Sequence, residues 1–503
     1  MPKTFYITTP IYYVNGKPSI GHAYTAIAAD VLARYHRMLG EEVLFQTGTD
    51  ENSQKNIEAA AKVGKENDVQ GYLDEMASVW ERTFDSLGLT HDRFIRTTEA
   101  VHFKAVEKFW KTVEANGDIY LGTYEGLYCQ GCEAFVNETD LVDGLCPFHK
   151  KAPTPLKEQN YFFKLSKYRD DLLAYIGEHP EFIQPESRRN EVLSYVRDFM
   201  TDISISRETM NCGIPVPGDE KHRIYVWFDA LINYLSGIGY GTDDQNFEKW
   251  WPANLHLVGK DIIKFHCALW PAMLMSAGLS LPKQVFAHGF FTIDGQKMSK
   301  SLGNTVDPIE VSEKYGLEAV RYFLLREIPF GADGDFSEGR IVARYENELA
   351  NEFGNLVNRV LAMTEKYTGG IVPEKADGFL AGAWPSYHLA LEEVRLTDAL
   401  DIVWSVIRQA NQFVEQQQPW QLAKLEEKKM LNDTLYVLLE TLRHIAWMIY
   451  PFMPTTAEKL FGQLGLEAPK EFTQSFESAW VWGELEPGHK IIKGEPLFPK
   501  KEK

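Results

Sequence analysis

The N-terminal part of the chain alternates short apolar runs with one apolar pattern of helical period. Residues 4–9 are aromatic and β-branched, which predicts a buried strand, and residues 42–47 predict a second strand. Between them, apolar positions recur every three or four residues and predict a helix over residues 21–39. Residues 10–19 are expected to form the connecting loop. This strand–helix–strand order is typical of a doubly wound α/β sheet, in which ligands bind at the carboxyl ends of the strands.

The middle of the chain interrupts this alternation. Glycine, proline and cysteine accumulate over residues 116–225, which indicates an inserted module. Sheet-like segments then return at residues 223–227, 255–258 and 285–288, with a helical segment at 261–277. The simplest interpretation is a Rossmann-type domain that resumes after the insertion.

Helical periodicity dominates after about residue 340. Apolar residues spaced by three and four form stripes from Val342 to Met363, from Leu389 to Val414 and from Leu431 to Ile449. The middle stripe has one gap of seven residues. These patterns predict an α-helical bundle with the striped residues in its core.

Composition and charge add general constraints. The 503 residues are 44% hydrophobic and 24% charged, as in ordinary globular proteins, and no apolar run approaches the length of a membrane helix. The start of the chain leads straight into the first predicted strand, so a cytoplasmic location is expected. The formal charge of −19 argues against a broad nucleic-acid-binding surface. Residues 489–503, with five lysines against two glutamates, suit either a local RNA contact or a solubilising tail.

Four residues have the spacing of a zinc knuckle. Cys129 and Cys132 form a CxxC pair, and Cys146 and His149 form a CxxH pair after 13 intervening residues. These ligand types in two tight pairs suit a tetrahedral structural Zn²⁺ ion. Because protein side chains fill all four positions, we expect the ion to hold the insertion in shape rather than to take part in catalysis.

Two short motifs suit a polyphosphate ligand. Gly21 and His22 stand at the start of the first predicted helix, where free N–H groups and the helix dipole favour anions. The segment 297–301, which reads KMSKS, supplies two ammonium groups and two hydroxyls between flanking glycines. Each motif alone could be structural, a capping turn in the first case and a solvated loop in the second.

Together the two motifs resemble the signatures of class I aminoacyl-tRNA synthetases. The first signature reads SIGH over residues 19–22, so Ser19 replaces the first histidine of the family pattern, and 275 positions separate His22 from Lys297. Further segments resemble the methionyl-tRNA synthetase family over nearly the whole chain, in its bacterial form with one zinc knuckle. These segments are residues 12–16, 48–51, 225–230 and 259–266, together with the cysteine knuckle.

Related synthetases fit less well. The isoleucyl, valyl and leucyl enzymes resemble the chain in class, but they carry a large editing insertion for which the interval between the motifs leaves little room. Cysteinyl enzymes also hold zinc, through ligands that are scattered in sequence rather than grouped in a knuckle.

The resemblance implies ATP-dependent activation of L-methionine to methionyl-adenylate, with Mg²⁺ accompanying ATP, and transfer of methionine to tRNA(Met). It implies that the catalytic residues are His22, Lys297 and Lys300. ATP would bind Asn15, Gly21, His22, Gly259, Asp261, Lys297, Met298, Ser299 and Lys300. Methionine would bind Ile11, Tyr13, Asp50, Trp227, Ala230, Tyr234, Ile262 and His266. The tRNA anticodon would bind Asn355, Arg359, Asn411 and Trp420, and one structural Zn²⁺ would bind Cys129, Cys132, Cys146 and His149.

The expected fold class is α/β, with a Rossmann-type parallel-sheet catalytic domain, a zinc-bearing insertion and a following α-helical bundle domain. The expected boundaries are 1–115 and 226–280 for the two halves of the catalytic domain, 116–225 for the insertion, 281–340 for the KMSKS region, 341–485 for the anticodon-binding domain and 486–503 for the tail. A monomer is expected. The alternatives that stay open are a synthetase for another small apolar amino acid, a non-catalytic paralogue that binds tRNA or a protein partner, and a zinc-dependent nucleotidyltransferase.

Overall fold

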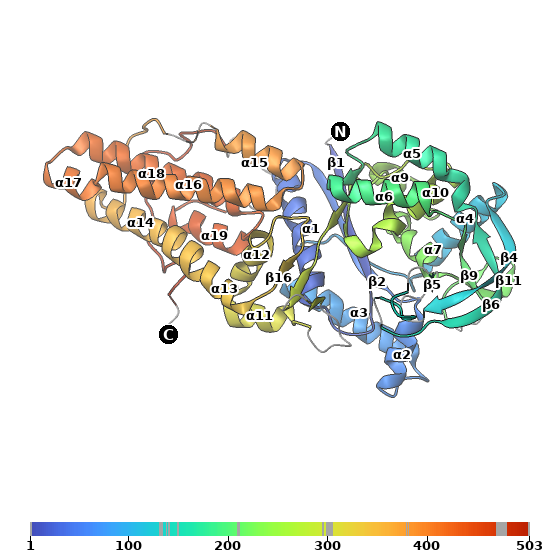
Figure 1. The fold of residues 1–503 in the computed structure, drawn as a ribbon. Helices are drawn as coiled ribbons and strands as arrows, with labels where there is room; N and C mark the ends of the chain where they lie inside the picture. Colours follow the sequence, from blue (N-terminus) through green and yellow to red (C-terminus); the bar gives the residue numbers. More distant parts are fainter. Residues whose placement is uncertain are drawn as a thin grey trace.

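The computed structural model places three parts side by side. It describes residues 3–129, 134–136, 138, 141–147, 150–208, 212–293, 296–297, 305–378, 380, 382–468 and 480–500. The helical domain forms one end of the molecule, the parallel sheet lies in the middle, and the antiparallel strands of the insertion form the other end (Figure 1). Among the described residues, no helix combines the length and the apolar character that crossing a membrane requires.

A six-stranded parallel sheet forms the centre of the molecule. Its strand order is β3-β2-β1-β12-β13-β7, and every neighbouring pair is parallel. The strands are β1 (Thr4–Tyr13), β2 (Glu42–Asp50), β3 (Arg93–Arg96), β7 (Ile183–Gln184), β12 (Leu255–Gly259) and β13 (Val285–His288). From β1 the chain builds outward to β2 and β3 on one side, and β12 lies on the other side. This reversal between β1 and β12 is the switch point at which such sheets bind ligands.

Two details differ from the sequence-based expectations. Residues 10–13, expected in a loop, continue β1, because the strand shifts register after Thr8 and then pairs with β2 as far as Tyr13 and Asp50. The strand expected over residues 223–227 is β11 (Asp219–Ile224), and it ends before Trp227, which lies on the short helix α7 (Val226–Leu231).

The first helix, α1 (Ile20–Met38), is buried on nearly every side. Sixteen of its 19 residues are buried, since it packs against the parallel sheet and also against the helical domain. Its buried charged residues are paired, as Arg34 is with Asp30 (2.8 Å), which makes their burial possible. The N-terminus of α1 therefore has a fixed position at the carboxyl edge of the sheet.

The insertion adds antiparallel strands to this framework. One sheet has the order β5-β4-β6-β8 and the other has the order β10-β11-β9. The first contains β4 (Ile119–Cys129), β5 (Ala134–Val136), β6 (Thr154–Phe163) and β8 (Ile203–Ser204); the second contains β9 (Ser206–Arg207), β10 (Pro215–Val216) and β11. Between β6 and β8 the chain forms α5 (Arg169–Glu178), β7 of the parallel sheet, and α6 (Glu186–Asp198).

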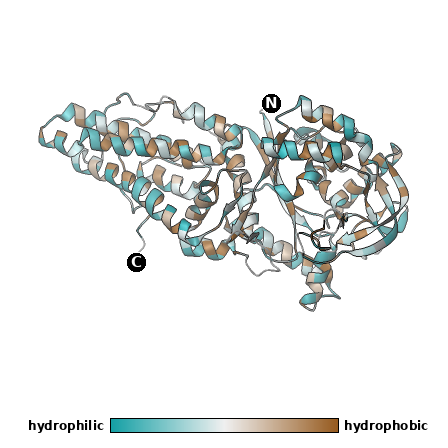
Figure 2. Cartoon of the chain, viewed as in Figure 1, coloured by the Kyte–Doolittle hydropathy of each residue, from teal (hydrophilic) through white to brown (hydrophobic). Residues whose placement is uncertain are grey.

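Long helices make up the C-terminal part. They include α12 (Leu317–Arg326), α13 (Glu338–Arg344), a π-helical stretch (Tyr345–Gly354), α14 (Asn355–Thr368), α15 (Ala383–Glu392), α16 (Leu396–Gln417), α17 (Pro419–Lys424), α18 (Lys428–Ile449) and α19 (Pro454–Gln463). Hydrophilic and hydrophobic positions alternate along them (Figure 2). The middle stripe of the sequence falls on two helices, because the chain turns at Val394, which has a φ of 58°. The prediction that Val342 and Leu389 belong to the core is wrong, since they are 39% and 53% exposed.

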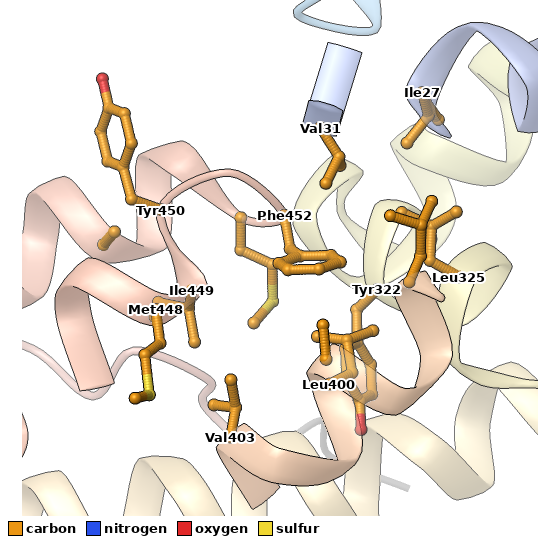
Figure 3. Packing of buried hydrophobic residues seen from close by; sticks show 14 of the residues in the cluster. Ile27, Val31, Tyr322, Leu325, Leu400, Val403, Met448, Ile449, Tyr450 and Phe452 are labelled. Carbon is orange, nitrogen blue, oxygen red and sulfur yellow. The ribbon is translucent and has the colours of Figure 1, made fainter. Parts of the chain in front are cut away.

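An apolar joint connects the sheet domain to the helices. Buried residues of α1, α12, α16 and α18 pack there around Phe452 (Figure 3). The fully buried Arg321 guanidinium also lies at this joint, and it donates to Asp30 Oδ2 (2.7 Å) and to the Phe452 carbonyl (2.9 Å). Burial alone would raise the pKa of the Asp30 carboxyl, but Arg34 and Arg321 outweigh it and hold that pKa below its ordinary range.

Candidate active site

The loop after β1 places His22 at the switch point of the sheet. The backbone N–H of Ser19 donates to His22 Nδ1 (2.9 Å), and Ser19 Oγ lies 3.0 Å from the same nitrogen. Since Nδ1 accepts an N–H, the neutral imidazole carries its proton on Nε2. An N–H on Nε2, at the start of a helix, is a suitable donor for a phosphate oxygen.

Aromatic residues fix the orientation of the His22 ring. Its centroid lies 5.1 Å from that of Tyr12 and 4.9 Å from that of Trp80, in edge-on geometry. Trp80, on α3 (Val69–Ser86), donates its ring N–H to the carbonyl of Gly16 (3.0 Å) and so also holds the loop that contains Asn15. Trp80 could not be predicted as a site residue, because it stands at an ordinary core position of a helix.

The residues after β12 lie on the other side of the switch point. A Cβ at Gly259 would lie 2.9 Å from Asp261 Oδ1 and 3.1 Å from Phe290 Cε1, so a larger residue there would force these side chains to move. Asp261 is exposed in the following turn. The structure therefore brings Gly259 and Asp261 to the same sheet edge as Gly21 and His22.

The KMSKS segment is described only at its beginning. Lys297 lies on β15 (Gln296–Lys297), where its backbone is the partner of Thr292 on β14 (Phe291–Ile293). Met298, Ser299 and Lys300 lie outside the described residues. Further along the chain, the Val306 carbonyl accepts a hydrogen bond from the backbone N–H of Ile20 (2.9 Å). The chain that follows this segment is thus attached to the N-terminus of α1.

Aromatic residues from two short helical segments form the apolar part of the site. Trp227 stacks on Phe265 with ring centroids 3.8 Å apart and meets the His266 ring edge-on at 6.5 Å. The Tyr234 hydroxyl is 2.7 Å from His266 Nε2, and His266 Nδ1 is 3.1 Å from the carbonyl of Ile262. Only an Nδ1–H can bond a carbonyl, so in the neutral ring Nε2 accepts from the Tyr234 hydroxyl. Burial lowers the pKa of His266 to about 4, which agrees with this protonation state.

The other expected methionine-binding residues come from strand ends. Tyr13 on β1 is the register partner of Asp50 on β2, and Ile11 lies two residues earlier on the same face as Tyr13. Asp50 is buried, and Ile11 and Tyr13 are partly exposed. Ala230 lies on α7 and is also buried.

Two expected zinc ligands fall within the described residues. Cys129 ends β4, and Cys146 follows the turn closed by the Val142–Leu145 bridge; both cysteines are buried. Cys132 and His149 lie outside the described residues. Within the described part of the chain there is no cluster of three or more His, Cys, Asp or Glu side chains that could hold a metal ion.

The residues expected to read the anticodon lie at the far end of the helical domain. The Arg359 guanidinium on α14 lies 6.0 Å from the ring of Trp420 on α17, and it pairs with Glu415 (2.6 Å) on α16. Asn411 on α16 donates to the carbonyl of Glu352 (3.1 Å). Asn355, one helical turn before Arg359, is exposed. Three helices thus bring these four residues into one region.

This fold and this site define a class I aminoacyl-tRNA synthetase. Residues 5–154 and 138–361 match the family described as tRNA synthetases class I (M), and residues 381–503 match the anticodon binding domain of methionyl tRNA ligase. The chain belongs to the methionyl-tRNA synthetase family, as the motifs predicted.

Individual relatives agree with this membership. The chain is 48% identical to the methionine–tRNA ligase of Thermotoga maritima over 99% of its own length and 80% of that protein, and 44% identical to that of Rickettsia felis over 99% of both chains. A solved structure of Mycobacterium tuberculosis methionyl-tRNA synthetase in complex with methionyl-adenylate is 43% identical, with a TM-score of 0.94, and the match covers 99% of this chain and 100% of that one. The predicted fold class is confirmed as well.

Proposed function

We propose that this chain activates methionine with ATP and then transfers the methionyl group to tRNA, with the residue roles given below. One observation carries the proposal. The start of α1, with its oriented His22, follows β1, and the aromatic cluster of Trp227, Phe265 and His266 includes the residues just after β12, the parallel neighbour of β1, so both lie at the carboxyl edge of the sheet. A site of this kind holds a nucleotide phosphate chain next to a small apolar amino acid.

In the first reaction a carboxylate oxygen of methionine attacks the α-phosphorus of ATP. The bond from that phosphorus to the oxygen bridging to the β-phosphate breaks, and pyrophosphate leaves with Mg²⁺. No protein nucleophile is needed, so catalysis depends on positioning and on stabilising the developing charge. His22 Nε2–H and Asn15 donate to phosphate oxygens, and Gly21 lets the nucleotide approach the backbone. Lys297 and Lys300 neutralise the departing phosphates, with Met298 and Ser299 in the same loop.

The adenosine side is assigned to the residues after β12. Gly259 leaves space there that a larger residue would fill, and the exposed Asp261 carboxylate accepts hydrogen bonds from the ribose or from the amino-acid end of the adenylate. In the second reaction a hydroxyl of the terminal adenosine of tRNA attacks the methionyl carbonyl and AMP leaves. The family resemblance assigns this attack to the 2′-hydroxyl.

The methionine pocket combines apolar contacts with one carboxylate. Trp227 and Tyr234 offer aromatic surface to the polarizable thioether, for which contacts between sulfur and aromatic rings are favourable. Ala230, Ile262 and Ile11 leave room for an unbranched side chain, and the neutral His266 adds no charge. Tyr13 and Asp50 lie at the strand ends, where the Asp50 carboxylate pairs with the ammonium group of methionine.

A structural Zn²⁺ ion fits the donor set of the knuckle. Both described ligands, Cys129 and Cys146, are buried and stand at the end of a strand and beside a tight turn, as zinc-binding cysteines do. Cys132 and His149 complete the four ligands. When bound, the ion would cross-link two segments within the insertion, around residues 129–132 and 146–149, and would leave no ligand position for substrate.

The helical domain recognises the anticodon of tRNA(Met). Trp420 stacks on an unpaired base, while Arg359, Asn355 and Asn411 donate to base edges or phosphates. The distance of 6.0 Å between the Arg359 guanidinium and the Trp420 ring supports this proposal, because it brings an aromatic ring and a cation together.

The test is amino-acid-dependent exchange between ATP and pyrophosphate, run with each of the twenty amino acids and no tRNA. Exchange with methionine alone is expected. Exchange with a different amino acid would keep the class of enzyme and overturn the pocket, and no exchange from a folded, zinc-loaded protein would favour a non-catalytic paralogue.

A further inference from the structure

A chain of buried polar side chains lies behind the proposed methionine pocket. The amide N–H of Asn52 donates to Asp229 Oδ2 (2.8 Å), and His102 Nε2 lies 2.8 Å from Asp229 Oδ1. The second ring nitrogen of His102, a residue of α4 (Ala100–Ala115), is 2.8 Å from the hydroxyl of Ser236. His102 and Asp229 are fully buried, and Asn52 and Ser236 are 6% and 3% exposed.

The order Asp–His–Ser in this chain resembles a nucleophilic triad, but burial argues against that role. Ser236 lies on α8 (Asn233–Ser236), inside the core, and its hydroxyl also lies 3.3 Å from the carbonyl of Asn233. A nucleophile must reach its substrate. Since Asp229 and His102 are enclosed as well, the chain of hydrogen bonds can act on a ligand only through the residues that it holds in place.

The bond between Asn52 and Asp229 joins the two halves of the methionine pocket. Asn52 follows Asp50, the proposed ammonium-binding carboxylate, by two residues. Asp229 stands between Trp227 and Ala230 on α7, which form part of the proposed apolar wall. The hydrogen bond therefore fixes the end of β2 against α7 across 177 positions of sequence.

Further contacts restrict the movement of Asn52 and Asp229. Asn52 also donates to the carbonyl of Thr97 (3.2 Å), so both of its amide hydrogens have defined acceptors. The neighbouring Glu51 is buried and accepts two hydrogen bonds from Arg96, at 2.7 and 3.0 Å. A buried carboxylate is costly unless it is hydrogen-bonded, so Asp229 is stable here because Asn52 and His102 both donate to it.

We propose that Asp229, held by His102, is a positioning residue for methionine: through Asn52 it sets the distance between the carboxylate that binds the ammonium group and the aromatic wall that binds the side chain. The proposal rests on the methionine pocket proposed above and assigns Asp229 no contact with substrate. A buried bond of this kind acts on the affinity for methionine and leaves the affinity for ATP unchanged, because the ATP residues are on the other loops.

The test compares Asn52→Asp, Asp229→Asn and the double variant that carries both substitutions. Asn52→Asp sets two carboxylates against each other, and we expect the KM for methionine in pyrophosphate exchange to rise at least about tenfold, equivalent to about 1.4 kcal/mol. The KM for ATP should stay within about twofold. In the double variant an amide again donates to a carboxylate, but the carboxylate at position 52 also faces the Thr97 carbonyl. The KM for methionine should therefore fall at least about threefold below that of Asn52→Asp without returning fully to that of the starting protein. Calorimetric titration with methionine checks the same order of affinities.

Asp118→Asn is the matched control. Asp118 is 1% exposed and accepts hydrogen bonds from Lys167, Tyr168 and Ser276, away from the proposed pocket. The substitution Asp118→Asn should lower the melting temperature and leave the KM values for methionine and for ATP unchanged. Asp229→Asn, which keeps the shape of the side chain, serves if Asn52→Asp does not fold, and should raise the KM for methionine by about threefold.

Several outcomes would overturn the proposal. An equal rise of both KM values, a fall in kcat with both KM values unchanged, or a double variant no better than Asn52→Asp would each show that the network only stabilises the fold. Trp227→Ala separates this from failure of the pocket itself. If Trp227→Ala leaves the KM for methionine unchanged, the pocket is misplaced. If it raises that KM while the variants of Asn52 and Asp229 do not, only the positioning role is wrong.

Discussion

Arg321→Met tests how strongly the sheet domain depends on the helical domain. The guanidinium is fully buried and donates to Asp30 of α1, to the carbonyl of Leu87 (3.2 Å), and to two carbonyls of the turn after α18, those of Pro451 (3.3 Å) and Phe452 (2.9 Å). Methionine has a similar length and fits an apolar interior, so the substitution removes the hydrogen bonds with little loss of packing.

The expected cost follows from the groups left behind. Three buried main-chain carbonyls lose a donor, and each unsatisfied group costs about 1–3 kcal/mol. Asp30 keeps other partners, because Arg34 and the backbone and hydroxyl of Thr90 still donate to it. Some carbonyls will find water after relaxation. We therefore expect a loss of about 3–5 kcal/mol, the range for breaking a buried ion pair.

Urea unfolding measures this loss, followed by tryptophan fluorescence and by far-ultraviolet circular dichroism so that separate transitions of the two domains can be recognised. Arg395→Met is the matched control, since Arg395 is partly exposed and pairs with Glu393 and Asp398. Its removal should cost under about 1 kcal/mol. A cost for Arg321→Met no larger than that of the control would refute the reasoning.

Three further predictions concern the site. Because burial holds the pKa of His266 at about 4, methionine affinity should stay constant from pH 8 down to about pH 5. The folding stability that the neutral ring contributes is complete above about pH 6.5 and is lost as the pH falls towards about 4. Calorimetric titrations in which methionine affinity already weakens below pH 6.5 would contradict this assignment. Trp420→Ala should raise the KM for tRNA by about five- to a hundred-and-fiftyfold, from the loss of about 1–3 kcal/mol of stacking, with unchanged pyrophosphate exchange. Loss of both activities would argue against an anticodon role. Cys146→Ser should reduce bound zinc from about one ion per chain to near zero by mass spectrometry of metals, whereas Cys267→Ser, at a cysteine that is also buried, should retain it.

The sequence predicted those features that depend on local spacing. The period of α1, the strands at 255–258 and 285–288, and the position of His22 at a helix start all follow from residues close together in the chain. The helix at Trp227 was missed because a short buried helix and a buried strand have similar apolar composition.

Features that depend on distant pairing could not be predicted. The extension of β1 to Tyr13 requires β2 as its partner, and the burial of Asp229 requires Asn52 and His102 from other elements. A single Asn or His in a sequence gives no sign of such partners. For the same reason the motifs indicated His22 but not Trp80, which fixes the ring from a separate helix.

The buried surfaces of α1 limit how far this protein can be shortened. A fragment that kept only the nucleotide-binding part would carry Ile27 and Val31 uncovered, since these side chains pack among residues of the C-terminal helices (Figure 3). It would also lose the carbonyl acceptors of Pro451 and Phe452 for Arg321. Such a fragment should aggregate unless these positions are redesigned as polar. The helical domain that binds tRNA is thus also the domain that keeps the ATP-using catalytic domain soluble. A fusion protein built on the catalytic domain alone would need another segment to bury the same apolar surface of α1.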